Sequence, residues 1–161
     1  VRELFFNVPV RKGFLKKPVT ETNAVTDHMT RLILSGIFDK LPNLKFISGH
    51  WGEAVVFMLD RMDAIMRPQV TGLNKKISDY FRENIWFTPS GILSKSQLEY
   101  MVKYFGADHI LWALDYPYVK FEACSADFLL NSDLTDEEKE LIAHGNAERI
   151  LHLREGAERK P

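Results

Sequence analysis

Two polar residues stand at the carboxyl ends of apolar segments, and together they could transfer a proton or hold a metal ion. His50 follows residues 44–49, and Asp115 follows the apolar run 110–114. In parallel α/β sheets and barrels, catalytic groups gather at the carboxyl ends of the strands, because the loops there vary while the strands hold position. The ends of parallel strands also face the same side of the sheet. We therefore expect His50 and Asp115 to share one site.

The residues around His50 support this interpretation without excluding a simpler one. Gly49 and Gly52 flank the histidine, and Glu53 follows three residues later. Glycine lets the backbone pass close to a ligand, and a nearby carboxylate can hydrogen-bond to the imidazole and orient it. The simpler alternative is a histidine that caps a helix or fills a polar gap. Asp115 could likewise cap a helix or turn instead of holding a metal or a proton.

Other polar residues are weaker candidates. Ser90 ends the segment between the two sites and could offer a hydroxyl to the same rim, although an ordinary strand-to-helix turn explains it equally well. Arg61 and Arg67 could bind a substrate carboxylate in bidentate geometry, although most helical arginines are solvated. His28, in the first predicted helix, is better explained as a packed or surface histidine than as a metal ligand.

Hydrophobic periodicity predicts helices that alternate with strands. We expect strands at 44–48, 85–88 and 110–114, and helices at 20–38, 54–66, 95–105 and 121–130. Residues 68–76 are predicted to form an exposed loop. Strands that alternate with helices form βαβ units and a parallel sheet, so the fold class is α/β. About three such units would make up less than half of a (β/α)₈ barrel.

Two further helices are predicted near the carboxyl terminus. Thr135 and Glu138 form a capping box, Gly145 is expected to stop that helix, and residues 147–153 form a short final helix. Residues 154–161 form a polar tail.

Composition excludes several classes of function. The chain has 161 residues, 45% of them hydrophobic, and a net charge of -1, which is typical of one globular domain. This charge gives no broad reason to bind nucleic acid or anionic lipid, and no segment reaches the roughly 18 apolar residues of a membrane span. Cys124 is the only cysteine, which favours a reducing compartment and predicts a cytoplasmic protein. Phosphate-binding loops, serine-hydrolase elbows and zinc-binding CxxC pairs are absent from the sequence.

Residues 19–153 resemble the carboxyl-terminal part of the amidohydrolase-2 family, a group of (β/α)₈ metal-dependent hydrolases and decarboxylases. The similarity is greatest to the γ-resorcylate and aminocarboxymuconate-semialdehyde decarboxylases. It is carried, in order along the chain, by residues 31–45, 49–53, 87–91, 115–117 and 145–149. The resemblance implies the carboxyl-terminal portion of a TIM barrel that decarboxylates an aromatic or unsaturated carboxylic acid without oxidation.

The same resemblance assigns roles to individual residues. His50 matches a histidine that transfers protons, and Glu53 matches its partner. Asp115 matches the aspartate that binds a divalent metal, Zn or Mn, and can pass a proton to the substrate carbon. Arg61 matches an arginine that helps to bind the substrate, and Ser90 lies in a matching rim segment. We also expect a homo-oligomer.

The family's other metal ligands precede the segment that this chain matches. Zinc normally takes at least three protein ligands. We therefore expect this chain to be a fragment that binds metal weakly and has little activity by itself. Hydrolysis of a C–O or C–N bond remains an alternative, as does a non-catalytic remnant that associates with other chains through exposed sheet edges. Residues 1–18 do not match the family and instead resemble a short stretch of MutL-type mismatch-repair ATPases, from which no function follows.

Overall fold

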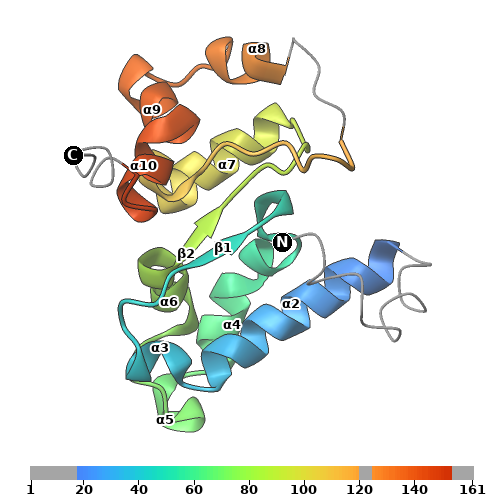
Figure 1. Cartoon of the computed structure of the whole chain (residues 1–161). Helices are drawn as coiled ribbons and strands as arrows, with labels where there is room; N and C mark the ends of the chain where they lie inside the picture. The colour runs from blue at the N-terminus through green and yellow to red at the C-terminus, as the bar shows by residue number, and fades with distance from the viewer. Residues whose placement is uncertain (1–17, 120–124, 154–161) are drawn as a thin grey trace.

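The structure is a computed structural model that describes residues 18–119 and 125–153. The predicted segments 1–18 and 154–161 lie outside these residues, apart from Pro18. Figure 1 shows strands β1 and β2 between two groups of helices, with α2 to α6 on one side and α7 to α10 on the other. The elements are α2 (Pro18–Leu34), α3 (Ile37–Lys40), β1 (Phe46–Ser48), α4 (Leu59–Ile65), α5 (Pro68–Thr71), α6 (Ile77–Asn84), β2 (Ile85–Phe87), α7 (Lys95–Phe105), α8 (Ser125–Leu130), α9 (Asp136–Glu140) and α10 (Asn146–Ile150).

The two strands confirm the predicted parallel pairing. Phe46 lies opposite Ile85, and Ser48 lies opposite Phe87, in a parallel ladder. All three residues of β2 are buried, whereas β1 buries only Ser48. β2 is therefore the inner strand of the pair, and β1 presents an outer edge.

The predicted third strand at 110–114 does not form a ladder. Its backbone makes one parallel bridge, between Ile110 and Phe87, and the Leu111 N–H donates to the Phe87 carbonyl. The next N–H, that of Trp112, donates to the carbonyl of Ile142 in a helical turn. The segment is therefore bonded to β2 on one side and to this helical turn on the other, and it makes no further pair with β2 among the described residues. The described residues thus hold two strands and one bridge, not three complete βα units.

Several predicted helices need correction. The helix expected at 20–38 ends at Leu34, because Gly36 adopts a left-handed conformation (φ 70°) before α3 begins. The helix expected at 54–66 consists of a 3₁₀ turn at Val55–Met58 followed by α4. Gly145 does not stop a helix, since it has helical dihedral angles and closes a π-helical turn, Leu141–Gly145, that joins α9 to α10.

Other helices agree with the sequence or were missed. α7 has the predicted bounds, and the capping box of Thr135 and Glu138 forms at the start of α9. The predicted loop 68–76 contains the short helix α5. Helix α6 was missed, although its buried residues lie on one face at helical spacing: Ile77, Ser78, Tyr80, Phe81 and Asn84.

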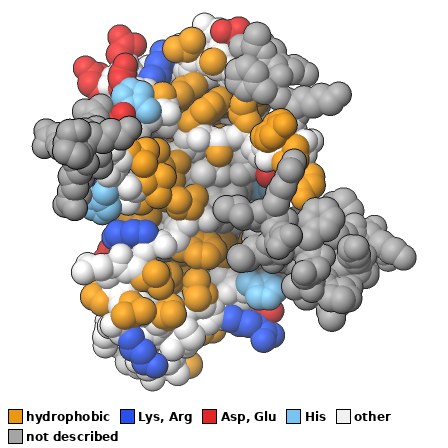
Figure 2. Space-filling view, viewed as in Figure 1, with side chains coloured by type: hydrophobic (Ala, Val, Ile, Leu, Met, Phe, Trp, Pro, Cys, Tyr) orange, Lys and Arg blue, Asp and Glu red, His pale blue; other side chains and the backbone are white. Residues whose placement is uncertain are grey.

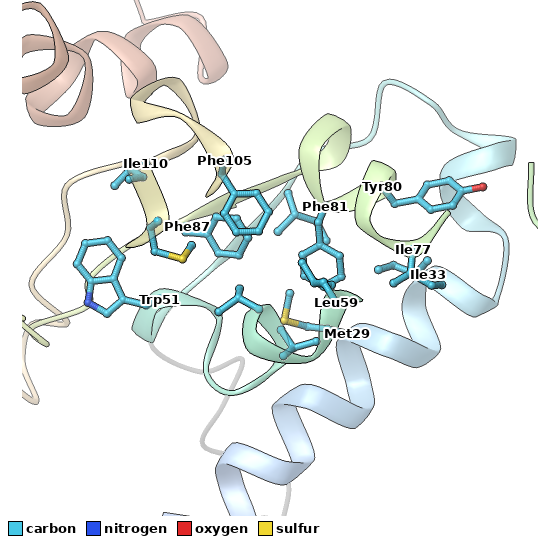
Figure 3. Packing of buried hydrophobic residues seen from close by; sticks show 14 of the residues in the cluster. Met29, Ile33, Trp51, Leu59, Ile77, Tyr80, Phe81, Phe87, Phe105 and Ile110 are labelled. Carbon is cyan, nitrogen blue, oxygen red and sulfur yellow. The ribbon is translucent and has the colours of Figure 1, made fainter. Parts of the chain in front are cut away.

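One hydrophobic core joins the strands to the helices on both sides (Figure 3). Phe87 is completely buried at its centre, and its ring lies 4.6 Å from that of Phe105 and 6.4 Å from that of Phe81. Phe81 comes from α6 and Phe105 from α7, so β2 is held from both groups of helices. This core fixes the strand that neighbours both predicted site segments.

Apolar side chains also remain on the surface. Figure 2 shows them over both groups of helices. Phe46 and Ile47 of β1 are 37% and 43% exposed, and Phe57 is 62% exposed. Within the parts of the chain that the structure describes, no helix is both long and apolar enough to cross a membrane.

Candidate active site

The structure brings His50, Glu53 and Asp115 together. The Nδ1 atom of His50 lies 3.4 Å from Oε1 of Glu53, and its Nε2 atom lies 3.5 Å from Oδ2 of Asp115. The imidazole is therefore held between two carboxylates, one at each ring nitrogen. All three side chains are partly accessible, at 39%, 22% and 34%.

This arrangement suits proton transfer. A neutral imidazole has one N–H and can donate to one carboxylate, whereas the protonated ring can donate to both. A proton can therefore enter on the Glu53 side of His50 and leave on the Asp115 side. Both loops, each following its strand or strand-like segment, face the same region, as predicted from the parallel arrangement.

The backbone at these positions is unusual. His50, Glu53 and Asp115 all have positive φ angles, of 50°, 55° and 60°, and so does Ser90 at 46°. Residues other than glycine rarely adopt such angles, and they concentrate at functional sites where the surrounding structure enforces them. The sharp turns aim the side chains of three different loops at one region.

Specific contacts hold the His50 loop in this conformation. The Trp51 N–H donates to the carbonyl of Thr88, and the buried Trp51 indole donates to the carbonyl of Ile92 at 2.7 Å. Gly52 has a φ of 75°, and a Cβ atom there would lie 2.8 Å from the ring of Phe87. The His50 loop is thus tied to the loop that follows β2.

Ser90 lies beside the site but is largely buried. Its hydroxyl is 2.7 Å from that of Thr88, and a Cβ atom on Gly49 would come within 2.9 Å of it. The Ser90 side chain therefore packs directly against the residue before His50.

The two candidate arginines lie in and just after helix α4, which follows the His50 loop. Arg61 is exposed on α4, and Arg67 is exposed just before α5. His28 is exposed on α2.

The described residues do not complete a metal site. Across residues 18–119 and 125–153, no three His, Cys, Asp or Glu side chains converge in a way that could hold a metal ion. Zinc normally requires at least three protein ligands. Asp115 can offer one carboxylate, so any metal held here would need ligands beyond this set.

Comparisons with known proteins identify the family. The family model described as amidohydrolase matches residues 8–153. Over 130 residues the chain is 35% identical to the γ-resorcylate decarboxylase of Polaromonas sp.. The aligned region covers 78% of this chain and 40% of that protein. A weaker similarity, 54% identity over 35 residues, links 22% of the chain to 6% of the MutL protein of Thermoanaerobacter pseudethanolicus.

Solved structures agree with the sequence relatives. The 5-carboxyvanillate decarboxylase of Sphingomonas paucimobilis is 39% identical with a TM-score of 0.70, over 83% of this chain and 39% of that chain. A dihydroxybenzoic acid decarboxylase from Polaromonas sp., with bound manganese and the inhibitor 2-nitroresorcinol, is 33% identical with a TM-score of 0.74. The match covers 80% of this chain and 40% of that chain. This chain thus spans about 40% of the length of these relatives. It has an α/β fold with TIM-barrel structural neighbours, and it belongs to the amidohydrolase-2 family.

Proposed function

We propose that this chain carries the proton-transfer part of a metal-dependent, nonoxidative decarboxylase of aromatic carboxylic acids. The observation that carries the proposal is His50 held between Glu53 and Asp115, at the ends of two parallel segments that both bond to β2. The relatives that are named decarboxylases supply the reaction class. γ-Resorcylate and 5-carboxyvanillate, which those names contain, define the substrate class.

In the proposed reaction, the bond between the ring and the carboxylate breaks and CO₂ leaves. The electron pair of that bond stays on the ring carbon, which takes up one proton. We assign this proton to the pair of His50 and Asp115, with Asp115 Oδ2 passing it to carbon and His50 Nε2 restoring it. Glu53 orients the ring from its Nδ1 side.

We propose a divalent metal, manganese or zinc, because the dihydroxybenzoic acid decarboxylase to which this chain is similar binds manganese. Asp115 is the proposed ligand from this chain. Because the described residues provide no three converging ligands, we propose that the chain alone binds metal weakly and turns over slowly. Arg61 is proposed to help bind the substrate carboxylate, and Ser90 to shape the adjoining rim.

Decarboxylation of γ-resorcylate and 5-carboxyvanillate in the presence of Mn²⁺ tests the reaction. We expect slow CO₂ release that falls by about 10²-fold or more in His50→Asn and in Asp115→Asn, in the range of lost acid–base catalysis. Lys103→Gln, an exposed substitution on α7, serves as the control and should keep the parental rate. A rate that does not differ between the parent and His50→Asn would contradict the proposal.

Calorimetric titration with Mn²⁺ tests the metal assignment. Weak binding that disappears in Asp115→Asn and persists in Lys103→Gln is expected. Binding that survives the loss of the Asp115 carboxylate would exclude this residue as a ligand. Zn²⁺ titrated in the same way distinguishes the two metals.

A second candidate function is association with another chain, including a second copy of this one. It is favoured by the outer edge of β1, where Phe46 and Ile47 are partly exposed and no further strand pairs among the described residues. Unpaired strand edges promote pairing between chains. Ile47→Lys should lower the oligomeric mass measured by light scattering if this edge forms a homo-oligomer.

Release of ammonia or an alcohol, instead of CO₂, would favour the alternative of a hydrolase.

A further inference from the structure

Two buried asparagines make the same contact at the beginnings of the two segments that carry His50 and Asp115. The Asn84 side chain donates through Nδ2 to the carbonyls of Pro42 and Leu44, each at 2.9 Å. The Asn146 side chain donates through Nδ2 to the carbonyls of Ala107 and Ile110, each at 2.8 Å. In both cases one amide group joins two carbonyls just before or at the start of the segment.

The carbonyls that the two asparagines bind lie at similar distances along the chain before His50 and Asp115. Leu44 precedes His50 by six residues, and Ile110 precedes Asp115 by five. Asn84 ends α6 and Asn146 begins α10, so each segment is bound to a helix from elsewhere in the chain.

Burial makes these contacts specific. Asn84 is 2% exposed and Asn146 is fully buried. A buried amide is costly unless its donors and acceptor are paired, so a slipped strand would leave it unsatisfied. Asn146 is fully paired, because its Oδ1 atom also accepts from Arg149, which donates to the carbonyl of Asp108 as well.

We propose that Asn84 and Asn146 are positioning residues that set the register of the His50 and Asp115 segments, so that the two side chains meet. The inference rests on the proposed site. A slip of one residue moves a strand by about 3.3 Å and turns its side chains to the opposite face. Such a slip would abolish the 3.5 Å approach of His50 Nε2 to Asp115 Oδ2.

NMR of the His50 imidazole in histidine-labelled chain tests this proposal without substrate or metal. The His50→Gln variant assigns the signal, and Asp115→Asn gives the change caused by losing the neighbouring carboxylate. We expect Asn146→Ser to shift the His50 signal in the same direction as Asp115→Asn. In the Asp115→Asn background, Asn146→Ser should cause no further shift, because it acts through Asp115.

Asn84→Ser is expected to behave differently. It displaces His50 itself and should therefore shift the signal in both backgrounds. Ser78→Ala removes the hydrogen bond that the buried Ser78 donates to Asp63, and serves as the control for destabilisation alone. It should leave the His50 signal in place.

A milder variant covers the case in which Asn146→Ser does not fold. Arg149 is exposed, so Arg149→Gln weakens the support of Asn146 without emptying a buried site. It should shift the His50 signal less than Asp115→Asn does, whereas Arg31→Gln, an exposed substitution on α2, should not shift it. Folded Asn146→Ser or Arg149→Gln with an unchanged His50 signal would overturn the proposal. The NMR result does not depend on decarboxylase activity. Failure of the proposed function can therefore be told apart from failure of this inference.

Discussion

The His50 arm (residues 44–50) and the Asp115 arm (residues 107–115) begin alike but are held differently. The His50 arm contains β1, whose three residues pair in register with β2. The Asp115 arm makes a single bridge to β2 and then binds the Ile142 carbonyl through the Trp112 N–H. One arm is thus held by a sheet ladder, and the other by individual hydrogen bonds to the helices near the carboxyl terminus.

This difference shows where the site is most vulnerable. A ladder distributes its strength over several backbone pairs, so the loss of one side chain should cost the His50 arm less stability than the Asp115 arm. The Asp115 arm depends on a few donors, including the side chains of Asn146 and Arg149. Residues 145–149, one of the segments that carry the family resemblance, therefore lie beside the backbone that leads to Asp115.

The largest effect is expected where both arms share support. Phe87 is fully buried, and its backbone is paired with both arms. Phe87→Ala should lower the free energy of unfolding by about 3–5 kcal/mol, because it leaves a cavity in the core. Urea denaturation measures the change. Phe57→Ala, at an exposed position, should cost far less, and equal losses would contradict the central place of Phe87.

Replacing each asparagine with alanine separates the arms. Asn146→Ala leaves the carbonyl of buried Ile110 without its donor and leaves the Ala107 carbonyl with only the 3.3 Å bond from the Ile110 N–H, so it should cost about 2–4 kcal/mol of unfolding free energy. Asn84→Ala frees the carbonyls of exposed Pro42 and Leu44, which water can reach, and should cost about 1–2 kcal/mol. Urea denaturation of both variants gives the comparison. A larger loss for Asn84→Ala would contradict the expectation that the Asp115 arm depends more on its asparagine than the His50 arm does.

Loss of a helix cap should affect only the Asp115 arm. The Thr135 hydroxyl accepts from the Glu138 N–H at the start of α9, and the adjoining π-helical turn supplies the Ile142 carbonyl. Thr135→Ala should cost about 1 kcal/mol. Hydrogen exchange should become faster at the Trp112 amide and remain unchanged in β1. Equal acceleration in both places would indicate that the arms are not independent.

High pH should lower the free energy of unfolding through Tyr80, which lies on helix α6, the helix that also carries Asn84. Burial, followed by the hydrogen bond to Asp39, raises the pKa of Tyr80 on α6 from 10.0 to about 12. The native state therefore keeps this proton more tightly than the unfolded state. Its contribution to stability is complete below pH 10.0 and is lost as the pH rises through about 12.

Tyr80→Phe should remove this part of the pH dependence in urea denaturation between pH 9 and pH 12, and the slope of stability against pH should become shallower. Tyr118→Phe, at a position that is 80% exposed, is the matched control and should keep the parental slope. An unchanged slope in Tyr80→Phe would show that this hydroxyl does not couple folding to pH.

The sequence predicted the parallel pair and the meeting of His50, Glu53 and Asp115, because strand ends and short-range spacing are local features. It did not predict that the 110–114 segment would bind a helix, since the Trp112–Ile142 hydrogen bond joins residues far apart in the chain. Asn84 and Asn146 were missed for the same reason. A buried asparagine in a helix gives no local signal of the two distant carbonyls that it binds.

The most direct test of the proposed proton-transfer pair is a double-mutant comparison of decarboxylation rates. Rates with Mn²⁺ would be measured for the parent, His50→Asn, Asp115→Asn and the variant with both changes. If the two residues act as one unit, the double variant should be about as slow as either single variant, because either loss disables the same step. Losses that multiply, or a single variant with the parental rate, would contradict the assignment of His50 and Asp115 to one site.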